Sequence, residues 1–112
     1  MPIEVDGKFI ATTASAFLED PDEWSKTVAE TMAAAEGLEL TAQHWDVIDY
    51  LRKEYFENNG HQPNNRTLLK EMGGLWGHKV NNKELFDLFP GNPSKQAGRL
   101  SGLPESMRKG GY

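Results

Sequence analysis

Few side chains in this sequence could do acid–base or metal chemistry, and they lie far apart. The three histidines, His44, His61 and His78, follow one another at equal intervals of 17 residues. A metal site built on one element needs much closer ligands, and no neighbouring carboxylate completes a zinc pattern. We therefore expect surface or partly buried polar roles for the histidines, and we predict neither a metal nor a cofactor.

Cysteine is absent from all 112 residues. Disulfides, thiolate nucleophiles, cysteine metal sites and persulfide carriage are therefore excluded. The carboxylates of Asp46, Asp49 and Glu54 remain, but they fall on the polar side of a predicted amphipathic helix, where Asp49 and Lys53 form an ordinary i,i+4 pair. This pattern favours a solvated helix face over an acid–base pair, so no catalytic residue is predicted.

Charge is unevenly distributed along the chain. The sequence holds 12 basic and 17 acidic side chains, for a net charge of −5. Residues 1–60 contain four basic and 13 acidic side chains, whereas residues 61–112 contain eight and four. Either this asymmetry is a dipolar surface that serves solubility, or a polyanionic or acidic partner meets the second half. With no long apolar run and no leader-like N-terminus, we expect a cytoplasmic protein that is not in a membrane.

Apolar spacing and turn residues predict a mainly α-helical domain. Asp6-Gly7 suits a tight turn inside a short β-hairpin at residues 3–10. Helices are expected over residues 20–37, 41–58, 65–72, 82–89 and 94–101, the third ended by Gly73-Gly74. We predict a compact orthogonal helical bundle as a single domain over 1–104, with the hairpin at its N-terminus and a flexible C-terminal arm at 105–112.

The segment from Thr41 to Met72 could form a helix-turn-helix-like unit. Its second helix would then present Asn64, Asn65, Arg66 and Lys70 outward, as side-chain types that read bases or contact phosphates. The connection between the two helices is longer than the usual turn, and the net charge of −5 repels DNA outside a local basic patch. A DNA-binding transcriptional regulator is therefore the alternative function.

The most specific motif is residues 89–104, FPGNPSKQAGRLSGLP. It resembles the C-terminal signature of the DsrC/TusE sulfur-relay family, which includes the gamma subunit of dissimilatory sulfite reductase. Further matches in the same register are IEVDGK at 3–8, LELT at 38–41, HWD at 44–46 and YLR at 50–52. The resemblance covers residues 3–104 and implies a compact helical fold with an N-terminal hairpin and a flexible C-terminal arm.

The resemblance also indicates which functional residues of the family this chain lacks. Family members carry sulfur on a cysteine next to the last residue of the arm, and some have a second cysteine upstream. The upstream position falls on Gly98, and the position on the arm falls on Gly111 or, counted forward from the upstream site, on Lys109. None of these residues can act as a nucleophile, so the sulfur-carrying chemistry of the family does not transfer to this chain.

These observations predict a non-catalytic family member that acts by protein–protein binding. Its partners would be subunits of a sulfite reductase or sulfur-relay complex, where it would regulate or compete with a cysteine-bearing paralogue. The cationic arm, with an aromatic residue at its tip, suits such docking. The predicted docking residues are Lys95, Arg99, Arg108, Lys109 and Tyr112.

Overall fold

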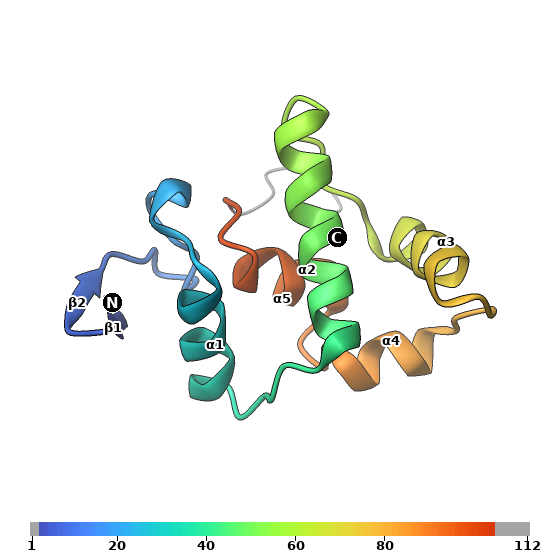
Figure 1. The fold of residues 1–112 in the computed structure, drawn as a ribbon, viewed down its shortest axis with the longest axis horizontal. Coiled ribbons are helices and arrows are strands. Elements are labelled where there is room, and N and C mark those ends of the chain that lie inside the picture. The colour runs from blue at the N-terminus through green and yellow to red at the C-terminus, as the bar shows by residue number, and fades with distance from the viewer. Residues whose placement is uncertain (1–2, 105–112) are drawn as a thin grey trace.

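The computed structural model describes residues 3–104, with residues 1–2 and 105–112 outside the described part. It confirms a mainly helical fold with one two-stranded antiparallel sheet at its N-terminus (Figure 1). The predicted C-terminal arm lies outside the described residues. None of the helices within residues 3–104 is long and apolar enough to span a membrane. The elements are β1 (Ile3–Val5), β2 (Lys8–Ile10), the 3-10 turn η1 (Pro21–Glu23), α1 (Lys26–Ala35), α2 (Ala42–Glu57), α3 (Asn65–Trp76), α4 (Asn82–Leu88) and α5 (Pro93–Leu100).

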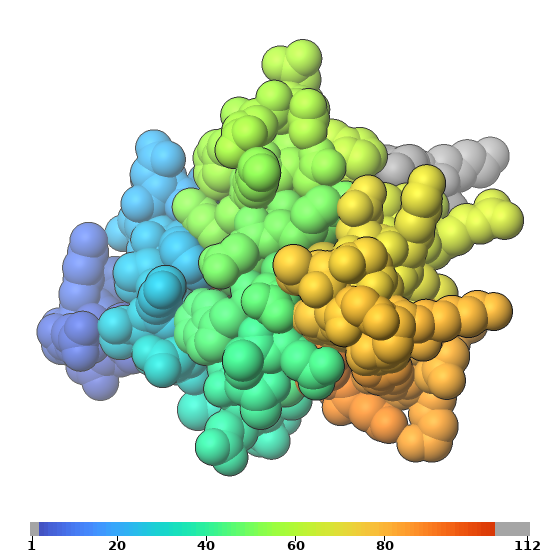
Figure 2. Space-filling view, turned by 45° about the vertical axis from the view of Figure 1, so that its right-hand side comes forward, coloured from blue at the N-terminus to red at the C-terminus, as the bar shows by residue number. Residues whose placement is uncertain are grey.

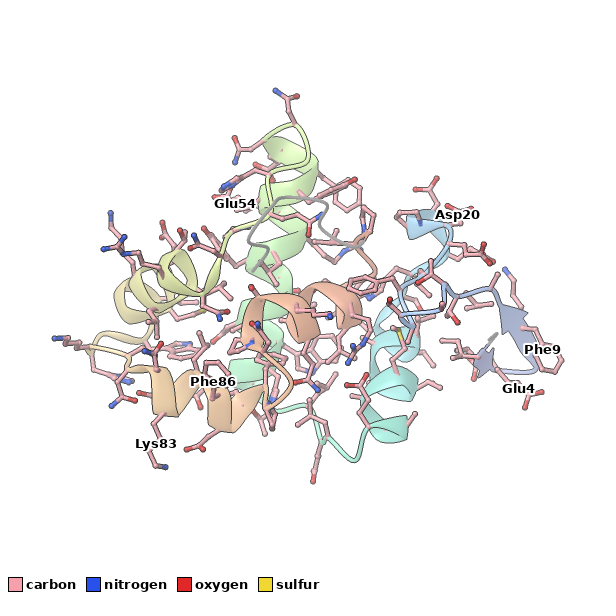
Figure 3. All side chains as sticks on the ribbon, turned by 180° about the vertical axis from the view of Figure 1, so that it is seen from behind. Glu4, Phe9, Asp20, Glu54, Lys83 and Phe86 are labelled. Carbon is pink, nitrogen blue, oxygen red and sulfur yellow. The ribbon has the colours of Figure 1, made fainter. Side chains whose placement is uncertain are left out.

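The predicted hairpin is confirmed. β1 pairs antiparallel with β2, and the turn residues Asp6 and Gly7 have φ angles of 52° and 80°. Asp and Gly tolerate these positive angles, which a tight two-residue turn requires at both positions. Val5 and Ile10 are buried, whereas Phe9 is 69% exposed and extends from the outer end of the hairpin (Figure 3).

Helix α5 lies at the centre of the domain. It contacts α1, α2, α3 and α4, and it lies behind the long helix α2 in Figure 1. In the space-filling view, α2 crosses the middle of the molecule, with the hairpin and α1 on one side and α3 and α4 on the other (Figure 2). Burial of apolar side chains between these helices is the main stabilising contribution. The fully buried side chains at this centre include Val47, Ile48, Leu68, Leu85, Phe89, Ala97 and Leu100.

The single helix predicted over residues 20–37 is wrong. Asp20 caps only the short turn η1, accepting a 3.0 Å hydrogen bond from the Asp22 backbone N–H. Trp24 then has an extended backbone, and Ser25 caps α1 by accepting a 3.2 Å bond from the Val28 N–H. The interruption has a tertiary cause, because the indole of Trp24 is hydrogen-bonded to the end of α5.

The predicted end of the third helix at Gly73-Gly74 is also wrong. Helix α3 continues to Trp76 and ends at Gly77, whose φ of 75° is left-handed and whose N–H donates a 3.0 Å bond to the Gly73 carbonyl. Two glycines inside a helix weaken it by only about 1 kcal/mol each. The indole of Trp76, bonded to Asp46 on α2, holds the last turn in place.

Candidate functional site

The end of α5 is clamped by two side chains from distant parts of the chain. The Trp24 Nε1–H donates a 2.8 Å hydrogen bond to the Leu100 carbonyl, and Arg52 Nη1 donates a 2.7 Å bond to the Ser101 carbonyl. The Arg52 guanidinium carbon also lies 3.9 Å from the centre of the Trp24 ring. Carbonyls at a helix C-terminus lack partners within the helix and attract positive charge, so this pair fixes the end of α5.

The residues that follow α5, up to residue 104, are also held in place by the rest of the domain. Gly102 has a φ of 74°, and a Cβ atom added there would lie 2.5 Å from Trp24 Cδ1. Only glycine suits both the left-handed backbone and this close approach. Leu103 is fully buried, and Gln62 Nε2 donates a 3.1 Å bond to the Pro104 carbonyl. The segment that follows residue 104 therefore begins from a fixed point.

One carboxylate ties α5 to the end of α1. Glu36 Oε1 accepts a 2.7 Å hydrogen bond from Gln96 Nε2, and Arg99 contacts the same carboxylate through Nε and Nη2. The two-point contact between a guanidinium and a carboxylate is a strong and directional form of ion pair. Arg99, a predicted docking residue, is thus engaged within the domain, and its side chain is 16% exposed.

Gly98 lies buried in α5, at the position where the resemblance places the upstream cysteine of the family. A Cβ atom added there would meet no atom within 4 Å outside the local helix backbone and its chain neighbours. The position could therefore hold a small side chain without steric conflict. Of the other predicted site residues, Lys95 is half-buried and interacts within the described part of the chain. Arg108, Lys109, Gly111 and Tyr112 lie outside the described residues.

His44 is a buried structural residue. Its Nδ1 lies 3.0 Å from the Thr41 N–H nitrogen and 2.8 Å from Thr41 Oγ1, and its Nε2 lies 2.7 Å from the Leu88 carbonyl oxygen. A carbonyl can only accept, so Nε2 carries the proton and Nδ1 accepts, which is the neutral form of the ring. Burial lowers the pKa of His44, although the bond to Leu88 acts in the opposite direction. The ring therefore joins the start of α2 to the end of α4.

The other two histidines are more exposed. His61 Nδ1 lies 3.8 Å from Glu54 Oε2, and His78 Nε2 lies 2.9 Å from Glu84 Oε2. Across residues 3–104, no three His, Cys, Asp or Glu side chains are grouped so that they could hold a metal ion.

The predicted solvated face of α2 is only partly correct. Asp49 is exposed, but Asp46 is half-buried and its Oδ2 accepts a 2.8 Å hydrogen bond from Trp76 Nε1. The prediction for Asp46 was wrong because its partner lies 30 residues away, on α3. Asp46 is thus a packing residue between α2 and α3.

The prediction that Asn64 and Asn65 face outward is wrong. Asn64 caps α3, with its Oδ1 accepting a 3.0 Å bond from the Thr67 N–H. Asn65 accepts a 2.8 Å bond from the Ser94 N–H and donates a 3.0 Å bond to Asn92 Oδ1, which joins α3 to the start of α5. Only Arg66 and Lys70 of the four candidates are exposed, so DNA binding stays a prediction resting on those two side chains.

These features are those of a small, mainly helical protein with an N-terminal hairpin and a helix α5 that is held at its C-terminal end. The sequence model of the family described as "DsrC like protein" matches residues 4–108. Sulfurtransferase TusE of Salmonella typhimurium is 39% identical over 104 residues, covering 92% of this chain and 94% of the relative. The chain belongs to the DsrC/TusE family of sulfur-relay proteins.

Solved structures agree with this assignment. The solution structure of Allochromatium vinosum DsrC is 41% identical, with a TM-score of 0.86, and the match covers 96% of this chain and 98% of that one. The crystal structure of the oxidized gamma subunit of dissimilatory sulfite reductase from Archaeoglobus fulgidus is 33% identical, with a TM-score of 0.88 and the same coverage. The helical fold with an N-terminal hairpin that the resemblance implies is therefore confirmed.

Proposed function

We propose that this chain is a non-catalytic member of its family, which docks on a sulfite reductase or sulfur-relay complex without carrying sulfur. The observation that carries the proposal is the family fold over residues 3–104 combined with a sequence that contains no cysteine. Thiolates are the nucleophiles that take up and pass on sulfur, and no other side chain of this chain replaces them. Binding is the family property that a chain without cysteine can keep.

The proposed docking surface consists of the cationic side chains of α5 and of the segment beyond it, together with the aromatic side chain of Tyr112. Because Trp24, Arg52 and Gln62 fix the chain as far as residue 104, the docking segment starts from a defined position. Such preorganisation lowers the entropy lost on binding, and positive charges orient an approaching acidic partner. The residues assigned to this surface are Lys95, Arg99, Arg108, Lys109 and Tyr112, with Arg99 acting through the part of its guanidinium that Glu36 does not contact.

Docking without sulfur transfer would make the chain a regulator. By occupying the surface that a cysteine-bearing paralogue uses in the cytoplasm, it would lower the rate at which sulfur is delivered. The docked complex would be unproductive because Gly98, Gly111 and Lys109 offer no thiol.

An affinity pull-down from native extract tests the proposal, with the full-length chain compared with a form lacking residues 105–112. We expect only the full-length bait to recover sulfite reductase or sulfur-relay subunits, and both forms to unfold at nearly the same temperature. A Lys53→Ala variant is a matched control, since Lys53 is exposed and lies on α2. Equal recovery by both forms, or recovery of no sulfur protein by either, would contradict the proposal.

A further inference from the structure

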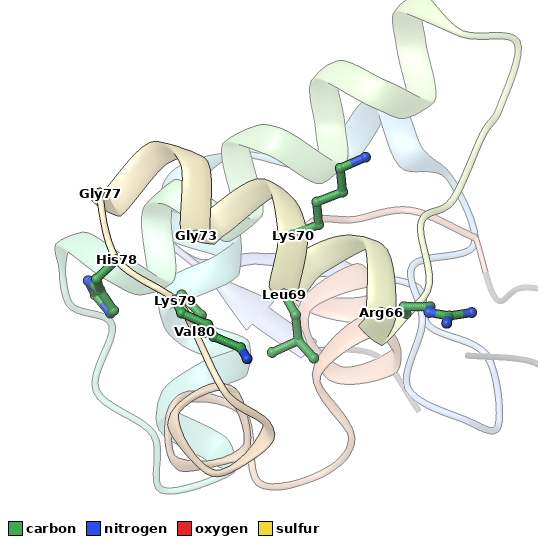
Figure 4. Close-up of a pocket in the computed structure, with 8 residues that line it drawn as sticks. All are labelled: Arg66, Leu69, Lys70, Gly73, Gly77, His78, Lys79 and Val80. Atoms are coloured by element: carbon green, nitrogen blue, oxygen red, sulfur yellow. The ribbon is translucent and has the colours of Figure 1, made fainter.

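A groove lies between α3 and the chain segment that follows it. Gly77, with its φ of 75°, turns the chain so that residues 78–80 run back alongside α3, leaving a hollow of about 610 Å³ (Figure 4). Gly73 lets the segment approach, because a Cβ atom there would lie 3.2 Å from the His78 carbonyl oxygen. Leu69 of α3 and Val80 of the returning segment supply the apolar part of the lining.

Three of the other lining residues are cationic. Arg66 and Lys70 lie one turn apart on α3, and Lys79 lies on the returning segment. All three are exposed, and within residues 3–104 no hydrogen bond or ion pair engages their side chains. Most other cations of the described chain have a partner, as Lys83 has in Asp87 and Arg99 in Glu36. Positive charge is thus left available at this groove.

We propose that the α3 groove binds an acidic peptide segment of a partner protein. Carboxylates of the peptide would pair with Arg66, Lys70 and Lys79, and an apolar side chain between them would pack on Leu69 and Val80. The groove belongs to α3 and the loop before α4, whereas the docking surface proposed above belongs to α5 and the segment beyond it. The two proposals therefore concern different surfaces, and each can be refuted without refuting the other.

An acidic peptide suits the groove better than a nucleic acid does. A phosphate backbone is bound through a run of cations that follows its length, whereas here the three cations come from two segments, α3 and residues 78–80, and share the lining of the hollow with Leu69 and Val80. The Glu84 carboxylate, whose Oε2 lies 2.9 Å from Nε2 of the lining residue His78, places negative charge beside the groove, which disfavours a polyanion. An apolar side chain flanked by carboxylates matches both the hollow and the charges around it.

Nuclear magnetic resonance titration of the isotope-labelled full-length chain tests this inference. The probe is a hexapeptide of two glutamates, leucine, phenylalanine and two glutamates, and its matched partner has glutamine in place of every glutamate. We expect the acidic peptide to shift amide signals within residues 66–80 and the glutamine peptide to bind at least about fivefold more weakly. This comparison uses the wild-type protein and does not depend on any variant folding.

Two charge-reversal variants provide a second test of the same inference. Lys70→Glu should weaken peptide binding by about fivefold or more, whereas Lys53→Glu, which changes the net charge equally on an exposed site of α2, should weaken it less than about twofold. Absence of shifts in residues 66–80, equal binding of the two peptides or equal effects of the two variants would overturn the inference. Tighter binding of a short single-stranded oligonucleotide at the same residues would overturn it in favour of nucleic acid.

Discussion

Trp24 and Arg52 bind consecutive carbonyl oxygens at the end of α5 while stacking on each other. Their donors lie 2.8 Å from the Leu100 oxygen and 2.7 Å from the Ser101 oxygen, and the guanidinium carbon lies 3.9 Å from the indole centre. Each side chain thus positions the other as well as the backbone. The pair fixes the end of α5, from which the described chain runs to residue 104, so changes to it should affect stability and docking together.

Replacing Gly102 by alanine should destabilise the domain by about 2–4 kcal/mol, because a left-handed backbone and an overlap with the indole both oppose a Cβ atom. The added Cβ would lie 2.5 Å from Trp24 Cδ1. Urea unfolding measures the loss. Gly74→Ala is the matched control, since a Cβ there meets no atom within 4 Å outside the local helix backbone and its chain neighbours, and its helical backbone should gain about 0.5–1 kcal/mol. A Gly102→Ala variant as stable as wild type would contradict the described path of the chain.

Arg52→Ala should lower the free energy of unfolding by about 2–3 kcal/mol. The variant loses a charged hydrogen bond to the Ser101 carbonyl and the stacking on Trp24, and it leaves the carbonyl without that donor. Lys53→Ala, at the next and exposed position of α2, should change stability by less than about 0.5 kcal/mol. Equal effects of the two substitutions in urea unfolding would show that Arg52 does not stabilise the domain through the clamp.

His44 should make the domain less stable in mild acid. Its pKa in the folded state is lowered from the ordinary value of 6.5, chiefly by burial. The unfolded chain therefore takes up the proton first, so stability is fully present above pH 6.5 and falls as the pH drops below 6.5 towards the lower folded-state pKa. Unfolding free energies measured between about pH 5 and pH 8 should show this fall for wild type and for His61→Gln, and a smaller fall for His44→Gln. An equal fall of the unfolding free energy with pH in all three proteins would rule out His44 as the source of the acid sensitivity.

The wild-type chain should acquire no sulfur from a persulfide donor, because the sequence offers no thiol. Intact-mass spectrometry after incubation with the donor measures this directly. A Gly111→Cys variant is the matched positive control, since it introduces one thiol at a position where the family resemblance places the cysteine of the arm. A mass increase of wild type by any multiple of the sulfur mass, removable by a reductant, would show that the chain carries sulfur by another residue.

Local patterns predicted the elements whose causes are local. Asp6-Gly7 determines the hairpin turn, and the apolar stripe around Ile48 and Leu51 determines α2. The extended backbone at Trp24 was missed because the partner of its indole lies 76 residues away. Sequence spacing contains no sign of that contact, and so the helix appeared continuous from residue 20.

The candidate site likewise combines features that the sequence predicted with features that only the structure shows. The resemblance identified the region of α5 and the position of Gly98 from sequence, but the clamp by Arg52 and the Glu36–Arg99 pair required the tertiary structure. Asn65 has a side chain that reads adenine in DNA complexes, yet here it bonds to the start of α5. The sequence alone does not show which basic side chains have a partner, so the unpaired cations of the α3 groove could be identified only from the structure.

The most direct test of docking without sulfur transfer is a competition measurement. A cysteine-bearing relative would be held on an isolated sulfite reductase or sulfur-relay complex, and its retention measured as this chain is added. We predict that the full-length chain displaces the relative in a dose-dependent manner, and that a form lacking residues 105–112 does not. Unchanged retention of the relative at saturating amounts of the full-length chain would contradict the central claim.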